Sequence, residues 1–322
     1  MVLAIIIVNY RTPQLIVDCL VSLLPEIAAL DAKVVVVDNC SGDDSLSIIG
    51  TWLHDHDAHR QVELLAAPTN GGFASGNNIG IRAVSASYYL LLNSDALVRP
   101  GAIAMLLETA RSHPDAGLFS PRLEWPDGRG QESCFRFHTP VSEFMGAAHT
   151  GIIDRLLQRF VVYWPVQTEI AMPEWTSFAC VMIRHDVLDV VGLLDEGYFM
   201  YFEDMAFCRK ARQAGWVVVH NPAARVVHLR GGTSTVKASA NQKKRVPRYY
   251  YESRARYFYQ FYGIIGLWVA NLLWWCGRAI AKTRLWLGHR DKTAVERQWL
   301  DIWTNCLAPL RPYTAPKTQT RE

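Results

Sequence analysis

The stretch LAIIIVNYRT, residues 3–12, decides the fold class of this chain. Its apolar run stops at Asn9, which is too early for a signal peptide, and no basic residue precedes it. A short apolar run that ends in polar residues is typical of a buried strand in a parallel sheet. The same pattern returns at 33–37 (KVVVV), 62–66 and 88–92 (YYLLL), and it predicts a strand at each place.

Apolar residues with helical spacing fill the gaps between these strands. They predict helices over 12–24, 43–54, 76–85 and 101–112. Alternating strands and helices indicate an α/β fold with a Rossmann-like, mostly parallel sheet flanked by helices. Residues 120–175 show no clear period. The other predicted elements are strands at 179–183 and 216–220 and a helix at 203–214.

The net charge of +3 hides a strong asymmetry along the 322 residues. Residues 225–322 carry 18 Lys and Arg against 5 Asp and Glu, so the preceding part has an acidic excess. A basic end on an acidic body indicates two tasks, although a solvated basic surface would give the same count. Because the basic end is also rich in tryptophan, we expect it to meet an anionic membrane surface and not nucleic acid.

The seven cysteines are scattered, and no Cys-x-x-Cys pair occurs. Their odd number and spacing argue against a disulfide framework and against a zinc ribbon. We therefore expect a reducing compartment, the cytoplasm.

Polar residues follow each predicted strand of the first half. Asn9 and Arg11 follow the first strand, Asp38 the second, the stretch 70–80 (NGGFASGNNIG) the third, and 93–95 (NSD) the fourth. Ligands of open parallel sheets collect at these carboxyl ends. A single such residue is more often a turn former or a helix cap, but four successive strand ends favour a binding site.

Two of these motifs indicate a particular chemistry. The glycines of 70–80 allow a close backbone approach to a ligand, although the stretch is neither a dinucleotide-binding fingerprint nor a P-loop. Asp95, after a buried strand, is suited to bind a divalent cation that bridges phosphates, with a helix cap as the alternative.

The second half adds a pair of carboxylates and two histidines. Glu203 and Asp204 stand at a predicted helix start after the aromatic run 197–202 (GYFMYF), which could desolvate a general base. Acidic residues are also common in first turns for reasons of the helix dipole. His228 is a candidate metal ligand. For His220 we expect a structural role.

Taken together, the motifs resemble those of inverting glycosyltransferases of family 2, most closely a bacterial rhamnosyltransferase-like branch. The resemblance covers about residues 1–260. It implies a GT-A fold, a nucleotide-diphosphate sugar donor (dTDP- or UDP-linked) and Mg²⁺ or Mn²⁺. The segments that carry it are VNYRT at 8–12, VVDNCSGD at 36–43, NGGFASGNNIG at 70–80, LLNSDALVRPG at 91–101, GLLDEGYFMYFEDMAFCRKARQAGW at 192–216 and ARVVHLRGGTS at 224–234.

The resemblance also implies roles for residues on the nucleotide side. Asn9 and Arg11 would lie near the nucleotide, and Asp38 would bind its base. Gly72 and Asn77 would line the nucleotide-sugar pocket.

Further roles concern the metal and the chemistry. Asn93 and Asp95 occupy the Asp-x-Asp-like motif and complete the nucleotide-sugar site, with Asp95 as metal ligand. His228 would complete the metal site. Asp204 would be the catalytic base, with Glu203 beside it.

Two positions depart from the family pattern. Ala206 replaces the last acidic residue of Glu-Asp-x-Asp, which leaves fewer carboxylates and gives Asp204 more weight. The pair 178–179 reads Phe-Ala where the family often has Gly-Ala, near the expected sugar or acceptor.

The resemblance implies transfer of a sugar, with rhamnose suggested by the nearest branch, to a hydroxyl of a glycan or lipid-linked acceptor in cell-surface polysaccharide synthesis. A non-catalytic nucleotide-sugar-binding subunit of a glycan-assembly complex is the alternative. A sugar-1-phosphate nucleotidyltransferase would need a glycine-rich basic loop after the first strand, and VNYRT contains no glycine.

The apolar stretch 263–277 is followed by basic residues and tryptophan. At 15 residues, the stretch is too short to span a bilayer. It predicts a helix that lies in the membrane interface. The alternative is a core helix that docks on the catalytic domain. We expect peripheral association with the inner face of the cell membrane. The predicted layout is a catalytic domain at 1–235 (donor part about 1–115, acceptor part about 116–235), a basic helical segment at 236–313 and a disordered tail at 314–322.

Overall fold

The structure is a computed structural model that describes residues 1–229, 236, 239, 242–287 and 295–315. It divides into two compact units. The sheet unit comprises residues 1–135, 164–196 and 203–233, and the helical unit comprises 136–163, 197–202 and 234–322. Residues 136–163 and 197–202 belong to the same unit as the C-terminal part, whereas the expected layout has one boundary near residue 235. The expected tail at 314–322 lies outside the described residues from 316 onward.

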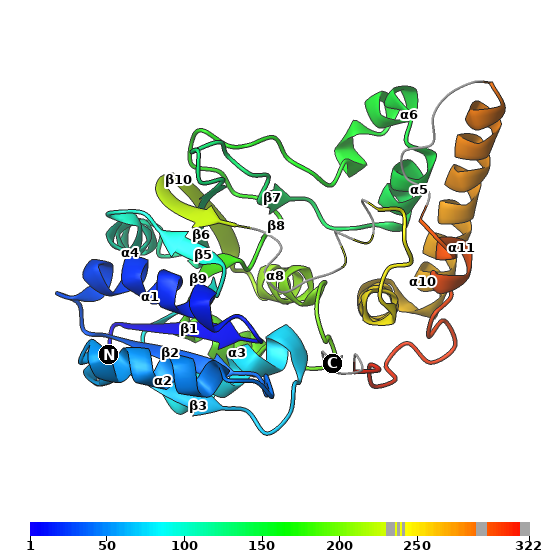
Figure 1. The fold of residues 1–322 in the computed structure, drawn as a ribbon. Helices are drawn as coiled ribbons and strands as arrows, with labels where there is room; N and C mark the ends of the chain where they lie inside the picture. The colour runs from blue at the N-terminus through cyan, green and yellow to red at the C-terminus, as the bar shows by residue number, and fades with distance from the viewer. Residues whose placement is uncertain (230–235, 237–238, 240–241, 288–294, 316–322) are drawn as a thin grey trace. The chain divides into compact units, whose positions relative to one another are not determined.

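An eight-stranded sheet forms the centre of the sheet unit, in the order β3-β2-β1-β4-β9-β6-β10-β5 (Figure 1). Its strands are β1 (Leu3–Asn9), β2 (Ala32–Asp38), β3 (Val62–Ala66), β4 (Tyr88–Asn93), β5 (Ala96–Val98), β6 (Ala116–Glu124), β9 (Cys180–Arg184) and β10 (Val217–His228). β9 runs antiparallel between β4 and β6, and β5 pairs antiparallel with β10. The other strands are parallel, which confirms the predicted mostly parallel sheet.

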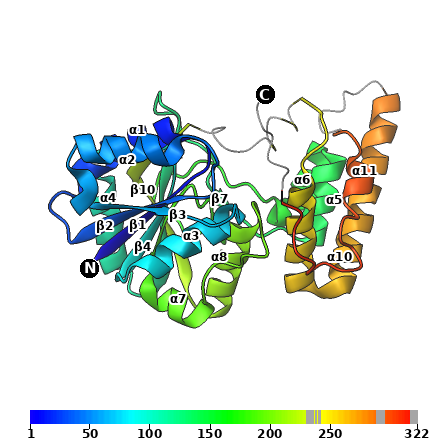
Figure 2. The same cartoon turned by 60° about the horizontal axis from the view of Figure 1, so that its bottom comes forward.

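Helices cover both faces of this sheet (Figure 2). They are α1 (Pro13–Ile27), α2 (Ser45–Asp55), α3 (Gly72–Ala83), α4 (Ala102–Ser112), α7 (His185–Val191) and α8 (Glu203–Gln213), with a short turn η1 (Ala58–Arg60). Side chains alternate between the two faces of a strand, so Leu3, Ile5 and Ile7 of β1 share one core cluster with α1, α2 and α4. The intervening residue Ile6 contacts α3 on the other face.

The glycines of 70–80 mainly serve this packing. A Cβ atom on Gly76 would lie 2.8 Å from Val8 Cγ1, so only glycine lets α3 approach β1 so closely. Gly80 meets Ile6 in the same way. Gly72 begins α3 with φ of +80°, a conformation that favours glycine. The helix therefore starts earlier than the predicted residue 76, and most of the stretch is helix, not a ligand-approaching loop.

The region 120–175 contains short elements that have no sequence period. β7 (Cys134–Phe135) and β8 (Trp175–Thr176) form a two-stranded ribbon in the sheet unit, with stacked Phe135 and Trp175 rings. The helical unit contains α5 (Pro140–Ala148), α6 (Gly151–Leu156), η2 (Gln158–Phe160), α10 (Arg248–Trp286) and α11 (Gln298–Asp301).

The helix α10 is two helices joined at Gly263, whose φ of +69° and ψ of −176° are not helical. A buried ionic cluster fixes both halves to α5. Arg254 donates to Glu143 Oε2 at 2.8 and 2.9 Å and to Asn271 Oδ1 at 2.7 Å. The guanidinium, together with His138, holds the pKa of the buried Glu143 carboxyl at about 2 against the opposing effect of burial. The apolar run 263–277 is therefore part of a longer helix with one packed face.

Candidate active site

Asp38 is the centre of a buried hydrogen-bond network at the carboxyl ends of β1 and β2. Its Oδ1 accepts from Asn9 Nδ2 at 2.7 Å and from Ser41 Oγ at 2.5 Å, and its Oδ2 accepts from the Ser41 backbone N–H at 3.1 Å. Asn9 and Asp38 are register partners of the parallel strands, which places them side by side. A carboxylate can accept about four hydrogen bonds, so Asp38 keeps capacity for a ligand.

Arg11 is fixed to the same network. Its backbone N–H donates to Ser41 Oγ, and its Nε donates to the Ser41 carbonyl, each at 2.9 Å. The residue adopts a φ of +59°, which is uncommon for a residue other than glycine. Ser41 therefore connects Asn9, Arg11 and Asp38, the three residues expected beside the nucleotide. We did not predict this role, although Ser41 lies within the VVDNCSGD motif.

A second group of side chains connects β2 with the start of α3. Asn39 Nδ2 donates to Asn70 Oδ1 and to the Gly72 carbonyl, both at 3.0 Å, and the Gly72 N–H donates to Asn70 Oδ1. Gly72 thus lies at the polar edge. Asn77 lies inside α3, and its amide donates to the Phe73 carbonyl one turn earlier.

Asn78, next to Asn77, has a role that the sequence did not suggest. Its side chain donates to the Leu194 carbonyl and to Glu196 Oε1, each at 2.8 Å, and accepts from the Leu194 N–H at 3.1 Å. Buried polar groups need such partners, and here they fix the segment before α8 against α3. A contact over 116 residues leaves no local signal in the sequence.

Thr12 and Ser94 connect the Asp38 network to the NSD motif. Asn9 Oδ1 accepts from the Thr12 N–H and hydroxyl, each at 3.2 Å, and Thr12 Oγ1 lies 3.4 Å from Ser94 Oγ. Asn93, half-buried, donates its backbone N–H to the Ala179 carbonyl at 2.9 Å. Residues that follow β1, β2 and β4 therefore form one continuous polar edge.

Asp95 and His228 face each other at the end of this edge. His228 Nε2 lies 3.4 Å from Asp95 Oδ1, and the two side chains are 13% and 6% exposed. Hydrogen bonds to both main-chain carbonyls hold the pair in place: the Leu229 N–H donates to the Asp95 carbonyl, and the Gln131 side-chain amide donates to the His228 carbonyl. Pairing of β5 with β10 accounts for this proximity of residues distant in sequence.

The pair fits a divalent cation site that a ligand completes. Within the described residues, His228 Nδ1 is buried without a hydrogen-bond partner. A carboxylate and an imidazole suit Mn²⁺ or Mg²⁺ when phosphate oxygens supply further ligands. The described residues contain no group of three or more His, Cys, Asp or Glu that could hold a metal by themselves. A cation held by Asp95 and His228 would therefore take most of its ligands from a diphosphate and water.

Glu203 and Asp204 begin α8 but have different environments. Glu203 is 6% exposed, and its Oε2 has no hydrogen-bond partner among the described residues. Burial and the adjacent Asp204 raise the pKa of Glu203 well above its usual value. Asp204 is half-buried, and its Oδ1 accepts from the Met205 N–H at 2.8 Å. Of the two carboxylates, Asp204 is the more exposed.

The raised pKa makes Glu203 a pH-dependent weakness in the fold. Below about pH 4.5 the carboxyl is protonated in both the folded and the unfolded protein, and Glu203 then costs the fold no stability. As the pH rises towards the higher pKa of the folded state, the unfolded protein loses this proton more easily, and the free energy of unfolding falls. Glu203→Gln should therefore raise the free energy of unfolding at pH 8 by roughly 1–3 kcal/mol. Near pH 4 the variant and the wild type should melt alike. Thermal melts across this pH range test the prediction, and equal gains at both pH values would contradict it.

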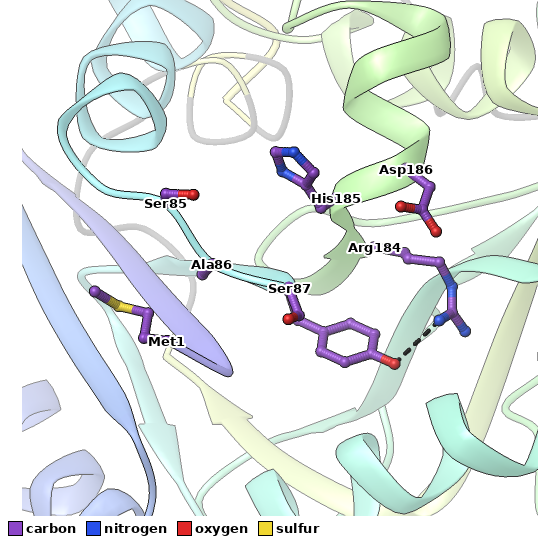
Figure 3. A pocket seen from close by; sticks show the side chains of 8 residues that line it. Met1, Ser85, Ala86, Ser87, Arg184, His185 and Asp186 are labelled. Carbon is purple, nitrogen blue, oxygen red and sulfur yellow. Dashed lines mark hydrogen bonds between the residues drawn. The ribbon is translucent and has the colours of Figure 1, made fainter.

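A cavity of about 470 Å³ lies elsewhere on the sheet unit, at the amino ends of β1 and β4 (Figure 3). Arg184, which lines the cavity, donates to the Tyr88 hydroxyl and to the carbonyls of Ala110 and Ala116. Because Arg184 makes these structural contacts, and because the predicted site residues lie at the carboxyl ends of the strands, we assign no ligand to this cavity.

The sheet order, the antiparallel β9 and the polar edge define an α/β domain of the GT-A class. Residues 4–151 match the family model described as glycosyl transferase family 2. The match covers somewhat less than half of the chain, and it confirms the resemblance that was drawn from the motifs.

Known proteins with curated functions show the same relationship. The chain is 29% identical to an N-acetylglucosaminyl-diphospho-decaprenol L-rhamnosyltransferase of Mycobacterium tuberculosis, over 61% of this chain and 66% of that protein. It is 27% identical to a low-salt glycan biosynthesis hexosyltransferase of Haloferax volcanii, over 66% of this chain and 62% of that protein. The similarity thus spans just under two thirds of these relatives.

A solved structure confirms the fold over nearly the whole chain. The mannosyltransferase of Pyrobaculum calidifontis, in complex with GDP-Man and Mn²⁺, aligns with a TM-score of 0.53 and 14% identity. The alignment covers 95% of this chain and 85% of the mannosyltransferase.

Proposed function

We propose that this protein transfers a sugar, with inversion, from a nucleotide-diphosphate donor to a hydroxyl of a glycan or lipid-linked acceptor. The observation that carries the proposal is the polar edge from Asp38 through Asn9, Thr12 and Ser94 to the Asp95–His228 pair. Such an edge offers, in sequence, a carboxylate for a base or ribose and a cation site for a diphosphate. This is the order of groups in a nucleotide-sugar.

On the donor side, the Asp38 carboxylate accepts hydrogen bonds from N–H or O–H groups of the nucleoside. Arg11, held to Ser41, places a cation at the same edge. Gly72, Asn77 and Asn93 line the path of the nucleotide-sugar. Asp95 and His228 would hold Mn²⁺ or Mg²⁺, and when bound the cation neutralises the charge of the departing diphosphate.

On the acceptor side, Asp204 acts as the general base. The acceptor oxygen forms a bond to the anomeric carbon, its proton passes to the Asp204 carboxylate, and the bond to the diphosphate breaks with its electron pair on the leaving oxygen. One displacement inverts the anomeric centre. Glu203, beside it and buried, supports the position and charge of Asp204.

The relative of M. tuberculosis supports a more specific form of this proposal. Its name describes rhamnose transfer to a diphospho-decaprenol-linked sugar. By analogy, the donor here is dTDP-rhamnose, with a UDP-sugar as the alternative, and the acceptor is lipid-linked. The protein then works in cell-surface polysaccharide synthesis, peripherally associated with the cytoplasmic face of the membrane.

Donor binding tests the proposal directly. Thermal melts with dTDP-, UDP- and GDP-sugars, each with and without Mn²⁺, should show stabilisation by one nucleotide class. At a donor concentration about 100 times Kd the gain is about 2.7 kcal/mol. Asp38→Asn should lose it, measured against its own ligand-free melting temperature, and the exposed Asp55→Asn should keep it.

Two results would oppose the proposal. Absence of stabilisation by every donor would contradict it. Donor binding without turnover on any lipid-linked acceptor would support the non-catalytic nucleotide-sugar-binding subunit.

A further inference from the structure

The second half of α10, residues 264–286, is the helix drawn in orange in Figure 1. It exposes a row of large apolar side chains. We call this row the apolar stripe; it consists of Ile265, Trp268, Val269, Leu272 and Trp275, which are 37–73% exposed. Their spacing of three or four residues places them on one side of a helix. Exposed apolar patches of this kind mark interaction sites.

The opposite side of the same helix is packed within the helical unit. Leu267, Ala270, Asn271 and Trp274 are buried. Gly277 lies against α5, where a Cβ atom would come within 2.4 Å of the Phe144 carbonyl oxygen. On the stripe side, Trp268 donates to the Cys306 carbonyl and the Trp275 ring lies edge-on to that of Trp299. Among the described residues these contacts leave Ile265 and Leu272 more than half exposed.

Charge around the stripe indicates the missing partner. Residues 264–286 contain no Asp or Glu, whereas Arg278, Lys282 and Arg284 lie towards the C-terminal end. Arg278 is placed over the Trp274 ring, and Lys282 is exposed. Trp286, 88% exposed, stands among these basic residues. Apolar residues, tryptophan and basic residues without acidic ones suit the boundary of an anionic bilayer.

We propose that the apolar stripe lies in the surface of an anionic membrane, with the helix parallel to the bilayer. Ile265, Val269 and Leu272 enter the acyl boundary, while Lys282 and Arg278 meet lipid phosphates. Membrane binding would bring the enzyme to a lipid-linked acceptor, and only this purpose rests on the proposed function.

The packed side favours this arrangement over a spanning helix. By length and composition alone, α10 could cross a membrane. Crossing would separate Gly277 from α5 and expose Asn271, whose Oδ1 accepts from Arg254, to hydrocarbon. A surface position keeps both contacts.

Flotation of the full-length protein with vesicles tests the inference. Wild type should bind phosphatidylcholine vesicles that contain phosphatidylglycerol, and bind them less in high salt or without the anionic lipid. Ile265→Ser with Leu272→Ser should weaken binding about tenfold or more. Val21→Ser with Val190→Ser, at equally exposed apolar positions of the sheet unit, is the matched control and should bind like wild type.

Several outcomes would overturn the inference. These are no binding by wild type, equal binding by the stripe variant, and equal binding to vesicles with and without anionic lipid. Resistance of membrane-bound protein to alkaline carbonate extraction would show a spanning helix instead. Stabilisation by the donor is measured separately on the same preparations. If donor binding is intact but vesicle binding is absent, only the membrane surface is refuted. If vesicle binding is intact but donor binding is absent, only the proposed function is refuted.

Discussion

Asp204→Asn is expected to lower kcat for sugar transfer by about 10²–10⁴-fold, the usual contribution of a general base. Asparagine keeps the size of the side chain and the oxygen that accepts from the Met205 N–H, so α8 should start unchanged. It cannot take the acceptor proton. Because no donor contact is assigned to Asp204, the donor-induced rise in melting temperature should remain. Single-turnover transfer with saturating donor and acceptor is the measurement.

The exposed Asp115→Asn, in the same unit, controls for loss of one surface carboxylate and should keep full activity. A second control comes from Glu203. Because Glu203 is buried and its pKa is raised, Glu203→Gln should reduce kcat far less than Asp204→Asn. If Glu203→Gln were the inactive variant and Asp204→Asn remained active, the assignment of the base would be wrong.

Asp95→Ala is expected to remove the metal-dependent part of donor binding and to lower turnover by on the order of 100-fold or more, since a cation at a diphosphate contributes several kcal/mol. The Asp95 side chain is nearly buried beside His228. Among the described residues, no third His, Cys, Asp or Glu lies close enough to form a metal site with this pair. Melting with donor, with and without Mn²⁺, separates the metal effect from any change in fold stability.

His228→Ala should show the same loss in a weaker form, because Asp95 remains as a charged ligand. Asp55→Ala, exposed on α2, is the matched control. Retention of a full Mn²⁺-dependent shift in Asp95→Ala would show that the cation, if used, binds elsewhere.

Local pattern was sufficient for the elements of the first half. The runs in β1 to β4 are short, apolar and ended by polar residues, and the intervening helices have apolar residues at helical spacing. These signals lie within about ten residues, so the sequence predicted the parallel part of the sheet and the polar edge at Asn9, Asp38 and Asp95.

Features that depend on distant contacts could not be found in this way. β9 carries an apolar run like the others, yet it inserts antiparallel between β4 and β6 because the chain returns from the opposite direction. The glycine stretch reads as a loop until Gly76 and Gly80 are seen against β1.

The chemical groups could be identified from local sequence: a carboxylate at the end of each of two strands, a carboxylate pair at the start of α8, and His228. Their neighbours and their exposure to solvent depend on the packing of distant segments. This packing placed His228 beside Asp95 through pairing of β5 with β10, and it buried Glu203 while leaving Asp204 accessible. The physical reason is that hydrogen-bond partners and solvent exposure are set by contacts between residues far apart in the chain, which residue type and local period do not encode.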